Sequence, residues 1–439
     1  MGSRAMRTRG SRHIYSHGCI GTSEPLRRTN PGRRTMRVKY LIIGAGITGC
    51  TAARLLQLHG EHDVMILEAE SEPGGLCRTK KIGPHFLDIG GGHFLCTRFP
   101  EVSEFIFSHI PRSEFCEFDR VSKIAIDGEI IDYPIEFNLW QLSVGKRHKY
   151  LDSALGAGEV QGHSQPVEFE KWIRWKLGDE IAEHYMLPYN RKIWGVEPDE
   201  MDVDWLSKIP RVDAQTILET WRSEKSARDR FPSHEKFYYP LEGGFQRVFD
   251  AICASVRDKI SLNHPVTRLE RRDDVWRVND AIDAEVVIST IPWATIHTAE
   301  GNDLSLEGDI SKLRWSSLVV SLFEENYSHD WHWLYCPDEN ISHHREFFIH
   351  NFARHSAPGG TYRETNVKRW KAGKGEIYSH TNPIAYPIPL RGHAGAAMAV
   401  HEHYAARRLY GVGRWGQHSY FNSDVCIHEA MLLVKHLLS

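Results

Sequence analysis

The feature that most constrains the fold of this chain is a glycine-rich turn that directly follows a short apolar run. Residues 38–43 read Val-Lys-Tyr-Leu-Ile-Ile, and Gly44, Gly46 and Gly49 follow with Gly-x-Gly-x-x-Gly spacing. The apolar run is typical of a buried parallel strand. In this motif the first glycine allows a tight turn, the second lets the backbone approach a pyrophosphate, and the third lets a helix pack closely on the strand. The sequence therefore predicts a dinucleotide-binding βαβ unit with the pyrophosphate at a helix N-terminus.

The segment after this turn has the order of elements that such a unit requires. Apolar spacing over residues 47–58 predicts a helix, and the apolar residues 64–67 predict the second parallel strand. That run ends in Glu68, where an acid accepts a hydrogen bond from a ribose hydroxyl. A βαβ unit without a ligand is the alternative, because the glycine motif alone is weak evidence.

Charge and composition favour some classes of protein over others. The 439 residues predict two or three domains, and the net charge of −3 gives no sign of a nucleic-acid partner. Residues 1–36 hold eight arginines and one acid, a net charge of +7, which favours a dispensable basic tail or a true start at Met36. We expect no membrane span, since every apolar run is short. The eight scattered cysteines lack a Cys-x-x-Cys pair, which favours reduced thiols in the cytoplasm.

The remaining patterns predict a nucleotide-binding domain assembled from separated pieces of chain. Helical spacing appears at 101–110 and 166–185, and an Asp-Gly turn within 124–133 predicts a hairpin. Residues 143–166 are rich in Gly, Ser and His and are expected to form a mobile loop. The predicted parts are a tail over 1–36, a nucleotide-binding domain over 37–100, 241–297 and 391–439, a mainly helical insertion over 101–203, and a sheet-rich substrate subdomain over 204–240 and 298–390.

Several of these motifs together resemble those of a known family. The loop Pro-Gly-Gly-Leu-Cys-Arg-Thr at 73–79 and the run Val-Val-Ile-Ser-Thr-Ile-Pro at 286–292, with the first βαβ unit, resemble flavin enzymes of the amine-oxidase and protoporphyrinogen-oxidase superfamily. More narrowly, the chain resembles the UDP-galactopyranose mutases. The segments that carry this second resemblance are 92–97, 132–138, 188–195 and 413–422.

The resemblance implies a fold, a cofactor and a reaction. The fold would be α/β, with a Rossmann-like FAD-binding domain, an inserted helical subdomain and an antiparallel-sheet substrate subdomain. The enzyme would be an isomerase that interconverts an NDP-hexopyranose and its furanose form, of the UDP- or GDP-galactose type. Reduced flavin N5 would attack the anomeric carbon, so a cellular flavin reductant is implied, and the resemblance also admits a homodimer.

Residue by residue, the resemblance and the needs of the chemistry suggest three sets of functional side chains. Arginine is the best clamp for a diphosphate, because its charge is permanent and its fork is fixed. The expected catalytic residues are His93, Arg414 and Tyr386. The expected substrate-binding residues are Tyr189, Asn190, Trp194, Arg211, Tyr239, Arg354 and Tyr420. The expected cofactor-binding residues are Gly44, Gly46, Gly49, Glu68, Gly74, Gly75, Arg78, Gly91, Gly92, Val266 and Asn422.

Two departures from the family pattern keep other functions open. Cys96 stands where the family often has a second histidine, and Asn422 stands where the bacterial enzymes have a carboxylate. The alternatives are an amine- or protoporphyrinogen-type oxidoreductase, a redox-independent mutase that needs a divalent cation such as Mg²⁺ or Mn²⁺, and a binding scaffold without turnover. No protein metal site is predicted, because 343–344 and 401–403 lack good ligand spacing. Uracil and guanine remain alternatives for the base.

Overall fold

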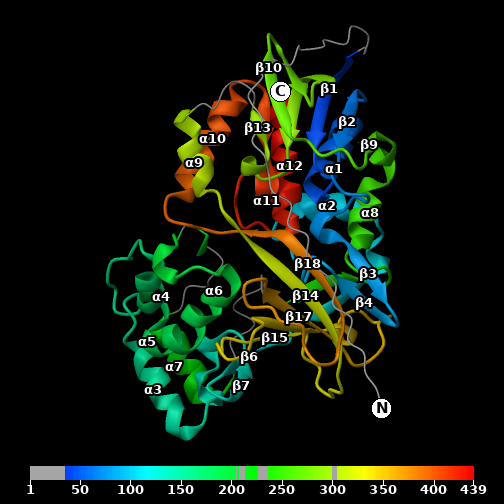
Figure 1. Cartoon of the computed structure of the whole chain (residues 1–439). Coiled ribbons are helices and arrows are strands. Elements are labelled where there is room, and N and C mark those ends of the chain that lie inside the picture. Colours follow the sequence, from blue (N-terminus) through cyan, green and yellow to red (C-terminus); the bar gives the residue numbers. More distant parts are fainter. Residues whose placement is uncertain (1–34, 204, 207–212, 226–235, 299–303) are drawn as a thin grey trace, which may run out of the picture. The chain divides into compact units, whose positions relative to one another are not determined.

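A mixed sheet carries the glycine motif in the spatial order β13-β10-β11-β12-β1-β2-β9, with β19 alongside β12 (Figure 1). The computed structural model describes residues 35–203, 205–206, 213–225, 236–298 and 304–439, and Met36–Ser439 form one compact unit. β1 pairs in parallel with β12 and β2, and β12 pairs in parallel with β19. The strands are β1 (Met36–Ile43), β2 (Val64–Leu67), β9 (Ile260–Ser261), β10 (Arg268–Arg272), β11 (Val275–Val278), β12 (Ile282–Ser289), β13 (His297–Thr298) and β19 (Leu409–Gly411).

Residues 40–43 of strand β1 are buried on both faces, which explains their unbroken run of apolar side chains. Tyr40 and Ile42 belong to one hydrophobic cluster, whereas Leu41 and Ile43 belong to another on the opposite face. Side chains alternate between the two faces of a strand, so a strand covered on both sides needs apolar residues at every position.

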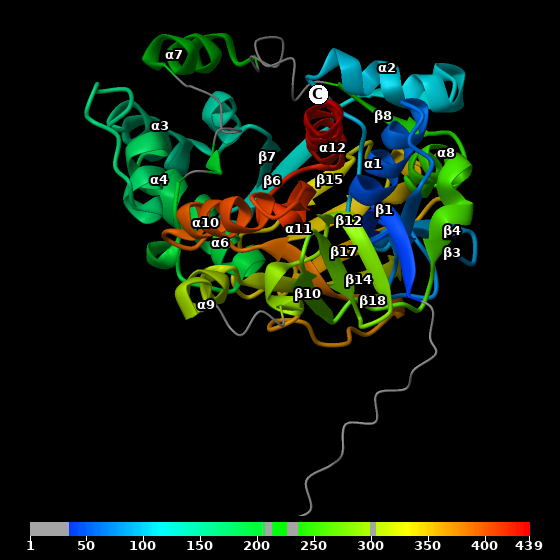
Figure 2. The same ribbon diagram turned by 90° about the horizontal axis from the view of Figure 1, so that it is seen from above.

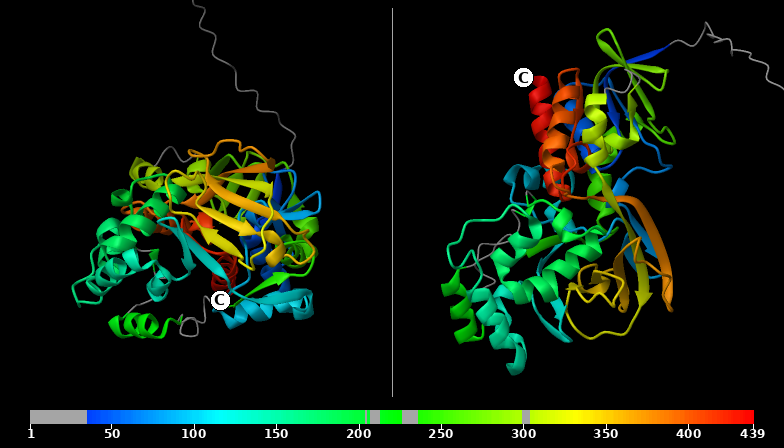
Figure 3. Two further views of the ribbon diagram at one scale, coloured as in Figure 1. Left: turned by 90° about the horizontal axis from the view of Figure 1, so that it is seen from below. Right: turned by 60° about the vertical axis from the view of Figure 1, so that its left-hand side comes forward.

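Helices cover both faces of this sheet. The first face carries α1 (Ile47–Leu58) against α12 (Ser423–Leu438), with α2 (Pro100–His109) and α8 (Gln246–Cys253) beside them. On the other face α10 (His393–Ala405) packs beside α9 (Leu304–Lys312), as Figure 3 shows. The predicted helix 47–58 and strand 64–67 are confirmed at their exact bounds.

A second, largely antiparallel sheet combines five strands from residues 315–387 with two strands from residues 122–132. Its spatial order is β18-β14-β17-β16-β15-β6-β7, and within it only the β15–β6 pair is parallel. Its strands are β6 (Ser122–Ile126), β7 (Glu129–Asp132), β14 (Trp315–Glu324), β15 (Trp333–Tyr335), β16 (Arg345–Phe348), β17 (Gly360–Asn366) and β18 (Glu376–Pro387). The predicted Asp-Gly hairpin is confirmed as β6–β7, with Asp127 and Gly128 at positive φ.

A helical subdomain lies apart from α1, α2 and α8 (Figure 2). Its helices are α3 (Val144–Leu155), α4 (Phe169–Leu177), α5 (Asp179–Ile181), α6 (Leu187–Trp194) and α7 (Ala214–Ser223), with a π-turn η5 (Ala182–Met186) between α5 and α6. Two small sheets pair β3 (Thr79–Ile82) with β4 (His85–Asp88), and β5 (Phe115–Asp119) with β8 (Lys236–Pro240). The short helical turns are η1 (Gly75–Cys77), η2 (Arg112–Glu114), η3 (Ile135–Phe137), η4 (Leu139–Gln141), η6 (Pro198–Glu200), η10 (Ala254–Lys259), η11 (Trp293–Thr295), η12 (Ile349–Asn351) and α11 (Gly413–Gly416).

The expected mobile loop over 143–166 is wrong, because its first half is helix α3. The composition of this stretch is polar, but Tyr150, Leu151 and Ala154 share one buried face and pack into the core of the helical subdomain. Three apolar side chains with helical spacing are enough to hold a helix once a core accepts them.

Three further observations concern segment 101–203, membrane-spanning helices and the predicted tail. Segment 101–203 is not helical throughout, since it also supplies β5, β6 and β7. In the described part of the chain, no helix has the length and apolar character needed to cross a membrane. The predicted tail lies outside the described residues, apart from Thr35 and Met36.

Candidate functional site

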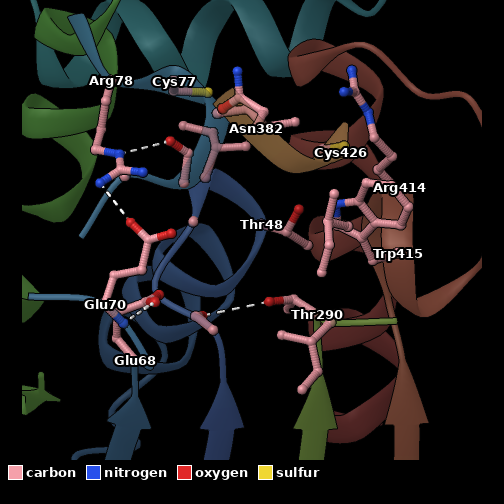
Figure 4. Close-up of a pocket in the computed structure, with 18 of the residues that line it drawn as sticks. Thr48, Glu68, Glu70, Cys77, Arg78, Thr290, Asn382, Arg414, Trp415 and Cys426 are labelled. Atoms are coloured by element: carbon pink, nitrogen blue, oxygen red, sulfur yellow. Dashed lines mark hydrogen bonds and ion pairs between the residues drawn. The ribbon is translucent and has the colours of Figure 1, made fainter. Parts of the chain in front are cut away.

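The first pocket lies at the carboxyl ends of the parallel strands. Gly44 and Gly46 follow β1, Glu68 follows β2 and Thr290 follows β12, and all four line the pocket. Figure 4 shows the strand arrowheads below the pocket, with Glu68 and Thr290 just above them. Ligands of open α/β sheets bind in the crevice at this edge. Other lining residues are Thr48, Glu70, Gly74, Gly75, Cys77, Arg78, His93, Asn382, Arg414, Trp415, Ser423 and Cys426.

The three motif glycines have three different surroundings. Gly44 has φ +99°, and a Cβ there would lie 2.4 Å from Thr290 Oγ1. A Cβ on Gly49 would lie 2.1 Å from the carbonyl oxygen of Gly44, so α1 packs directly on the turn. A Cβ on Gly46 would meet no described atom within 4 Å, so the backbone faces open space at the helix N-terminus. That space is where the motif places a pyrophosphate.

Glu68 is fixed at the end of β2 by main-chain donors. Its Oε2 accepts a hydrogen bond from Ala45 N at 2.7 Å, and its Oε1 accepts one from Glu70 N at 3.0 Å. Ala45 belongs to the glycine turn, so the carboxylate ties the turn to the second strand. Each carboxylate oxygen has a further lone pair, which suits a ribose diol.

The second glycine loop is folded onto the first one. Gly74 and Gly75 both have positive φ, and Gly74 N donates to Ala45 O at 2.9 Å. Arg78 is buried beside them, and its Nε donates to Gly75 O at 2.9 Å. Its Nη1 pairs with Glu70 Oε2 at 2.6 Å, an ion pair visible in Figure 4. The loop thus brings one arginine to the pocket with part of its charge compensated.

His93 lines the same pocket at the end nearest the second sheet. Its Nδ1 lies 2.8 Å from Gly91 O. Burial, helped by the Arg414 cation, lowers the pKa of His93 to about 4, so the imidazole is neutral at pH 7. Gly91 and Gly92 do not line the pocket but hold this loop against the second sheet, since a Cβ on Gly92 would lie 2.2 Å from the Phe347 ring.

A second pocket lies between the helical subdomain and the second sheet, and it is lined with aromatic side chains. It contains the predicted residues Tyr189, Asn190, Trp194, Tyr386 and Tyr420. The Trp194 ring lies 5.4 Å from the Tyr420 ring and 6.2 Å from the Tyr386 ring, in edge-to-face contacts. Trp194 Nε1 donates to Asn190 Oδ1 at 2.9 Å. The remaining lining residues are Arg120, Tyr133, Ile135, Glu136, Leu177, Tyr185, Met186, Ile193, Trp205, Tyr335, His344 and Arg345.

Arg345 is a cation of this pocket that the sequence analysis missed. It lies on β16 directly opposite Glu364 on β17, and its Nη2 donates to Glu364 Oε2 at 2.6 Å. Burial alone would raise the pKa of Glu364, but the Arg345 cation and a hydrogen bond from His344 outweigh it and lower that pKa to about 2. Glu364 Oε1 also accepts from Gly92 N at 2.7 Å. One buried carboxylate therefore positions both Arg345 and the loop that carries His93.

Arg414 belongs to the first pocket and lies close to two residues of the second. It lines the first pocket, and its guanidinium lies 5.7 Å from the Tyr386 ring and 5.8 Å from the Tyr420 ring of the second. The charges of Arg345 and Arg414 both lower the pKa of Tyr420, although burial raises it overall. Two permanent cations, one of them paired with Glu364, therefore lie near Tyr386 and Tyr420, an arrangement suited to a diphosphate.

Several predicted site residues are not brought to either pocket. Tyr239 is buried in the core, and its hydroxyl donates to Asp88 Oδ2 at 2.9 Å. Arg354 is exposed, and its guanidinium lies 5.6 Å from the Phe118 ring. Val266 packs in the core beneath the first sheet, and the exposed Asn422 precedes α12. The predicted Arg211 lies outside the described residues.

One group among the described residues could hold a metal ion, and it includes His343 of the histidine pair at 343–344, where no metal site is predicted. Cys336, His343 and Glu346 place their ligand atoms within 4.8 Å of one another. The Glu346 carboxylate already pairs with Arg363 at 2.7 Å and with His343 at 3.0 Å. None of the three residues lines either pocket.

Comparisons with known proteins agree with this arrangement. A model of NAD(P)-binding Rossmann-like domains matches residues 42–107, and one of flavin containing amine oxidoreductases matches residues 138–320. The dTDP-fucopyranose mutase of Escherichia coli is 27% identical over 90% of this chain and 96% of its own length. The probable UDP-galactopyranose mutase of Klebsiella pneumoniae is 22% identical over 91% of this chain and 94% of its own length. A chloroplastic protoporphyrinogen oxidase of Oryza sativa subsp. japonica is 24% identical over 66% of this chain. The match covers 58% of that relative's own length.

Solved structures share the fold. A crystal structure of reduced UDP-galactopyranose mutase has a TM-score of 0.81 at 20% identity and covers 91% of this chain and 94% of that one. A putative protoporphyrinogen oxidase from Exiguobacterium sp. 255-15 has a TM-score of 0.66 at 15% identity, with 92% and 99% covered.

Fold and first pocket together define a flavoprotein with the architecture of the flavin-containing amine oxidoreductases. Its cofactor is FAD, and the open backbone at Gly46 and the Glu68 carboxylate fit the pyrophosphate and ribose of that group. Within this class, the chain is similar over about nine tenths of its length to the dTDP-fucopyranose and UDP-galactopyranose mutases.

Proposed function

We propose that this chain is an isomerase that interconverts the pyranose and furanose forms of a nucleotide-diphosphate hexose. The observation that carries the proposal is Arg414, which lines the cofactor pocket and lies close to two tyrosine rings of a second pocket that also holds Trp194 and Arg345. An oxidase of amines or porphyrins needs an apolar channel at this place. Cations and hydroxyls instead suit a diphosphate next to the flavin.

The reaction changes ring size without net oxidation. When bound and reduced, FAD supplies the nucleophile for the anomeric carbon. The bond between that carbon and the diphosphate oxygen breaks and later forms again, so the nucleotide diphosphate must stay in place as leaving group and returning nucleophile. Holding it by fixed charges keeps the returning group at high effective concentration.

The side chains of the second pocket divide this work. Arg345 and Arg414 hold the diphosphate and stabilise the charge that develops on it as it leaves. The hydroxyls of Tyr386 and Tyr420 add hydrogen bonds without adding charge. Tyr189 and Trp194 offer flat apolar surfaces to the rest of the substrate. The neutral His93 borders the cofactor pocket and adds no positive charge beside the sugar.

The cellular setting and assembly form part of the proposal. A cellular reductant of flavins would keep the cofactor reduced, in the cytoplasm, and the assembly would be a homodimer. The product would be a nucleotide furanose of the galactofuranose type.

The decisive experiment supplies dithionite-reduced, FAD-loaded protein with UDP- and GDP-hexoses and follows the products by chromatography. We expect a new furanose peak that disappears when the same protein is kept oxidised. A chelator should change nothing, because the chemistry resides in the flavin. No furanose from any nucleotide sugar, with hydrogen peroxide released from an amine, would overturn the proposal. Turnover that ignores flavin reduction but stops with chelator would replace it with a cation-dependent reaction.

A further inference from the structure

The second pocket has two chemically different ends. At the cofactor end, Arg414 approaches the rings of Tyr386 and Tyr420. A second group of rings in this pocket lies in a row, since Tyr189 lies 5.5 Å from Tyr335, which lies 5.4 Å from Tyr133. None of these three rings lines the cofactor pocket, and we call the Tyr133 side of the second pocket its far end.

Glu136 lines this far end. It lies in η3, three residues after Tyr133, and its charge raises the pKa values of Tyr133 and Tyr185. The tyrosines at the cofactor end respond instead to Glu364, Arg345 and Arg414. Tyr133 also lies against a cation, because the Arg120 guanidinium is 4.5 Å from its ring, so the far end holds one charge of each sign.

The Glu136 carboxylate is buried without a side-chain partner. Only 6% of the residue is exposed, and in the described part of the chain its only hydrogen bond comes from its own backbone N–H. Burial raises its pKa, whereas the backbone N–H and the Lys176 cation act in the opposite direction. A buried carboxylate with free acceptor positions is costly unless a ligand supplies donors, so this group points to a ligand.

The orientation of the substrate follows from the proposed function, on which this inference rests. The reacting sugar must lie next to the flavin, and the diphosphate next to Arg414 and Arg345. The nucleobase then extends to the far end, between the tyrosine rings and Glu136. Aromatic rings stack on any base, so the rings provide affinity and the carboxylate provides selection.

We propose that Glu136 selects guanine, so that the substrate is a GDP-sugar. The Watson–Crick edge of guanine presents two adjacent donors, N1–H and the N2 amino group, which match the two oxygens of a carboxylate. Uracil and thymine present a single N3–H between two carbonyl oxygens, and one of these carbonyls would face the second carboxylate oxygen. Adenine and cytosine present an amino group next to a ring acceptor. A polar site built for one hydrogen-bond pattern rejects bases that leave it unpaired.

Binding of free nucleotides tests this selection apart from turnover. The FAD-loaded protein is titrated with GDP, UDP, dTDP and ADP by calorimetry. We expect GDP to bind at least about tenfold more tightly than the other three. In Glu136→Gln the amide has one donor and one acceptor, so the GDP-to-UDP preference should fall about tenfold or invert. The matched change Glu183→Gln, at an exposed carboxylate of the same subdomain, should leave the preference as it is.

The outcomes separate this inference from the proposed function. Equal or tighter binding of UDP or dTDP by the unmodified protein overturns the guanine assignment, even if Glu136→Gln fails to fold. An unchanged preference in a folded, FAD-loaded Glu136→Gln overturns it as well. Arg345→Ala should weaken all four nucleotides alike, and if it weakens none, the diphosphate placement fails. A clear GDP preference with no furanose from GDP-hexoses would leave the base assignment standing and refute the mutase reaction.

Discussion

Arg414 is held in position before any ligand arrives. Its Nε donates to Phe421 O at 2.8 Å, and its Nη1 donates to Ala385 O at 3.2 Å. A guanidinium anchored by two main-chain carbonyls loses little further freedom when it binds an anion. Its position close to both pockets therefore reflects preorganisation of a charge, which a flexible surface arginine would not offer.

Replacing this side chain tests the preorganised charge. In Arg414→Ala, a charge-assisted hydrogen bond of about 1.5–3 kcal/mol is lost, so the dissociation constant of a nucleotide diphosphate should rise about tenfold or more. Calorimetry of the FAD-loaded variant measures it. Arg414→Lys should recover only part of the lost affinity, because an ammonium group cannot reproduce the two-pronged hydrogen bonding of a guanidinium. The exposed Arg354→Ala serves as the control and should bind normally, and unchanged binding by Arg414→Ala would exclude the clamp.

Single residues also show where sequence reasoning stops. Arg414, Tyr189 and Trp194 were found because they stand in recognisable motifs, and all three reach a pocket. Arg345 stands in no motif, and its significance comes from Glu364, which faces it across two paired strands. That register is a property of the folded sheet, so no local pattern indicates it.

Among the elements, the turn between β1 and α1 follows most directly from sequence. Glycine is required there because a larger side chain would clash with atoms a few residues away or on the adjacent strand. One such atom is the Gly44 carbonyl oxygen beside Gly49. Helix α3 is the opposite case. Its polar composition suggests a loop, and the core that accepts Tyr150 and Leu151 is built by distant segments.

Gly46, which caps helix α1, and Gly49, which lies within it, give a matched pair of variants. Gly49→Ala places a methyl group 2.1 Å from the Gly44 carbonyl oxygen, so α1 must move off β1. Overpacking of this kind costs about 1–3 kcal/mol, and both thermal stability and FAD content should fall. Gly46→Ala meets no described atom within 4 Å and has φ −80°, so stability should hold while FAD binding is lost. Absorbance of bound flavin and the melting temperature measure the two effects, and full FAD retention by Gly46→Ala would contradict the pyrophosphate placement.

For the molecule as a whole, buried histidines should make stability depend on pH. Burial lowers the pKa values of His332, His344 and His418 to about 4. Unfolded histidine binds its proton near pH 6.5, so between pH 6.5 and 4 the unfolded state holds more protons and folding stability falls as pH falls. Each histidine removes about 3 kcal/mol across that range. Asp88 has the opposite effect, because burial raises its pKa to about 6, so its protonation stabilises the folded state as pH falls. This gain offsets the loss from about one of the histidines.

Urea unfolding at pH 7.5, 6 and 5 measures this loss. We expect the free energy of unfolding to decrease at each step, with the steepest change below pH 6. In His418→Gln the slope should become shallower by about 1.4 kcal/mol per pH unit, the effect of one proton. A stability that stays level from pH 6.5 to 4.5 would show that these histidines are not buried in neutral form.

Local sequence is sufficient for the FAD-binding unit of this protein, because a strand, a three-glycine turn, a helix and a second strand ending in Glu68 all lie within residues 36–68. The steric demand on Gly49 comes from Gly44, five residues away, so it can be inferred locally, whereas that on Gly44 comes from Thr290 on a distant strand. The second pocket depends on folding instead. It gathers Glu136 from η3, Tyr189 from α6, Arg345 from β16 and Tyr386 from β18. Strand register and helix packing decide which of these side chains meet, and those contacts join residues far apart in the chain.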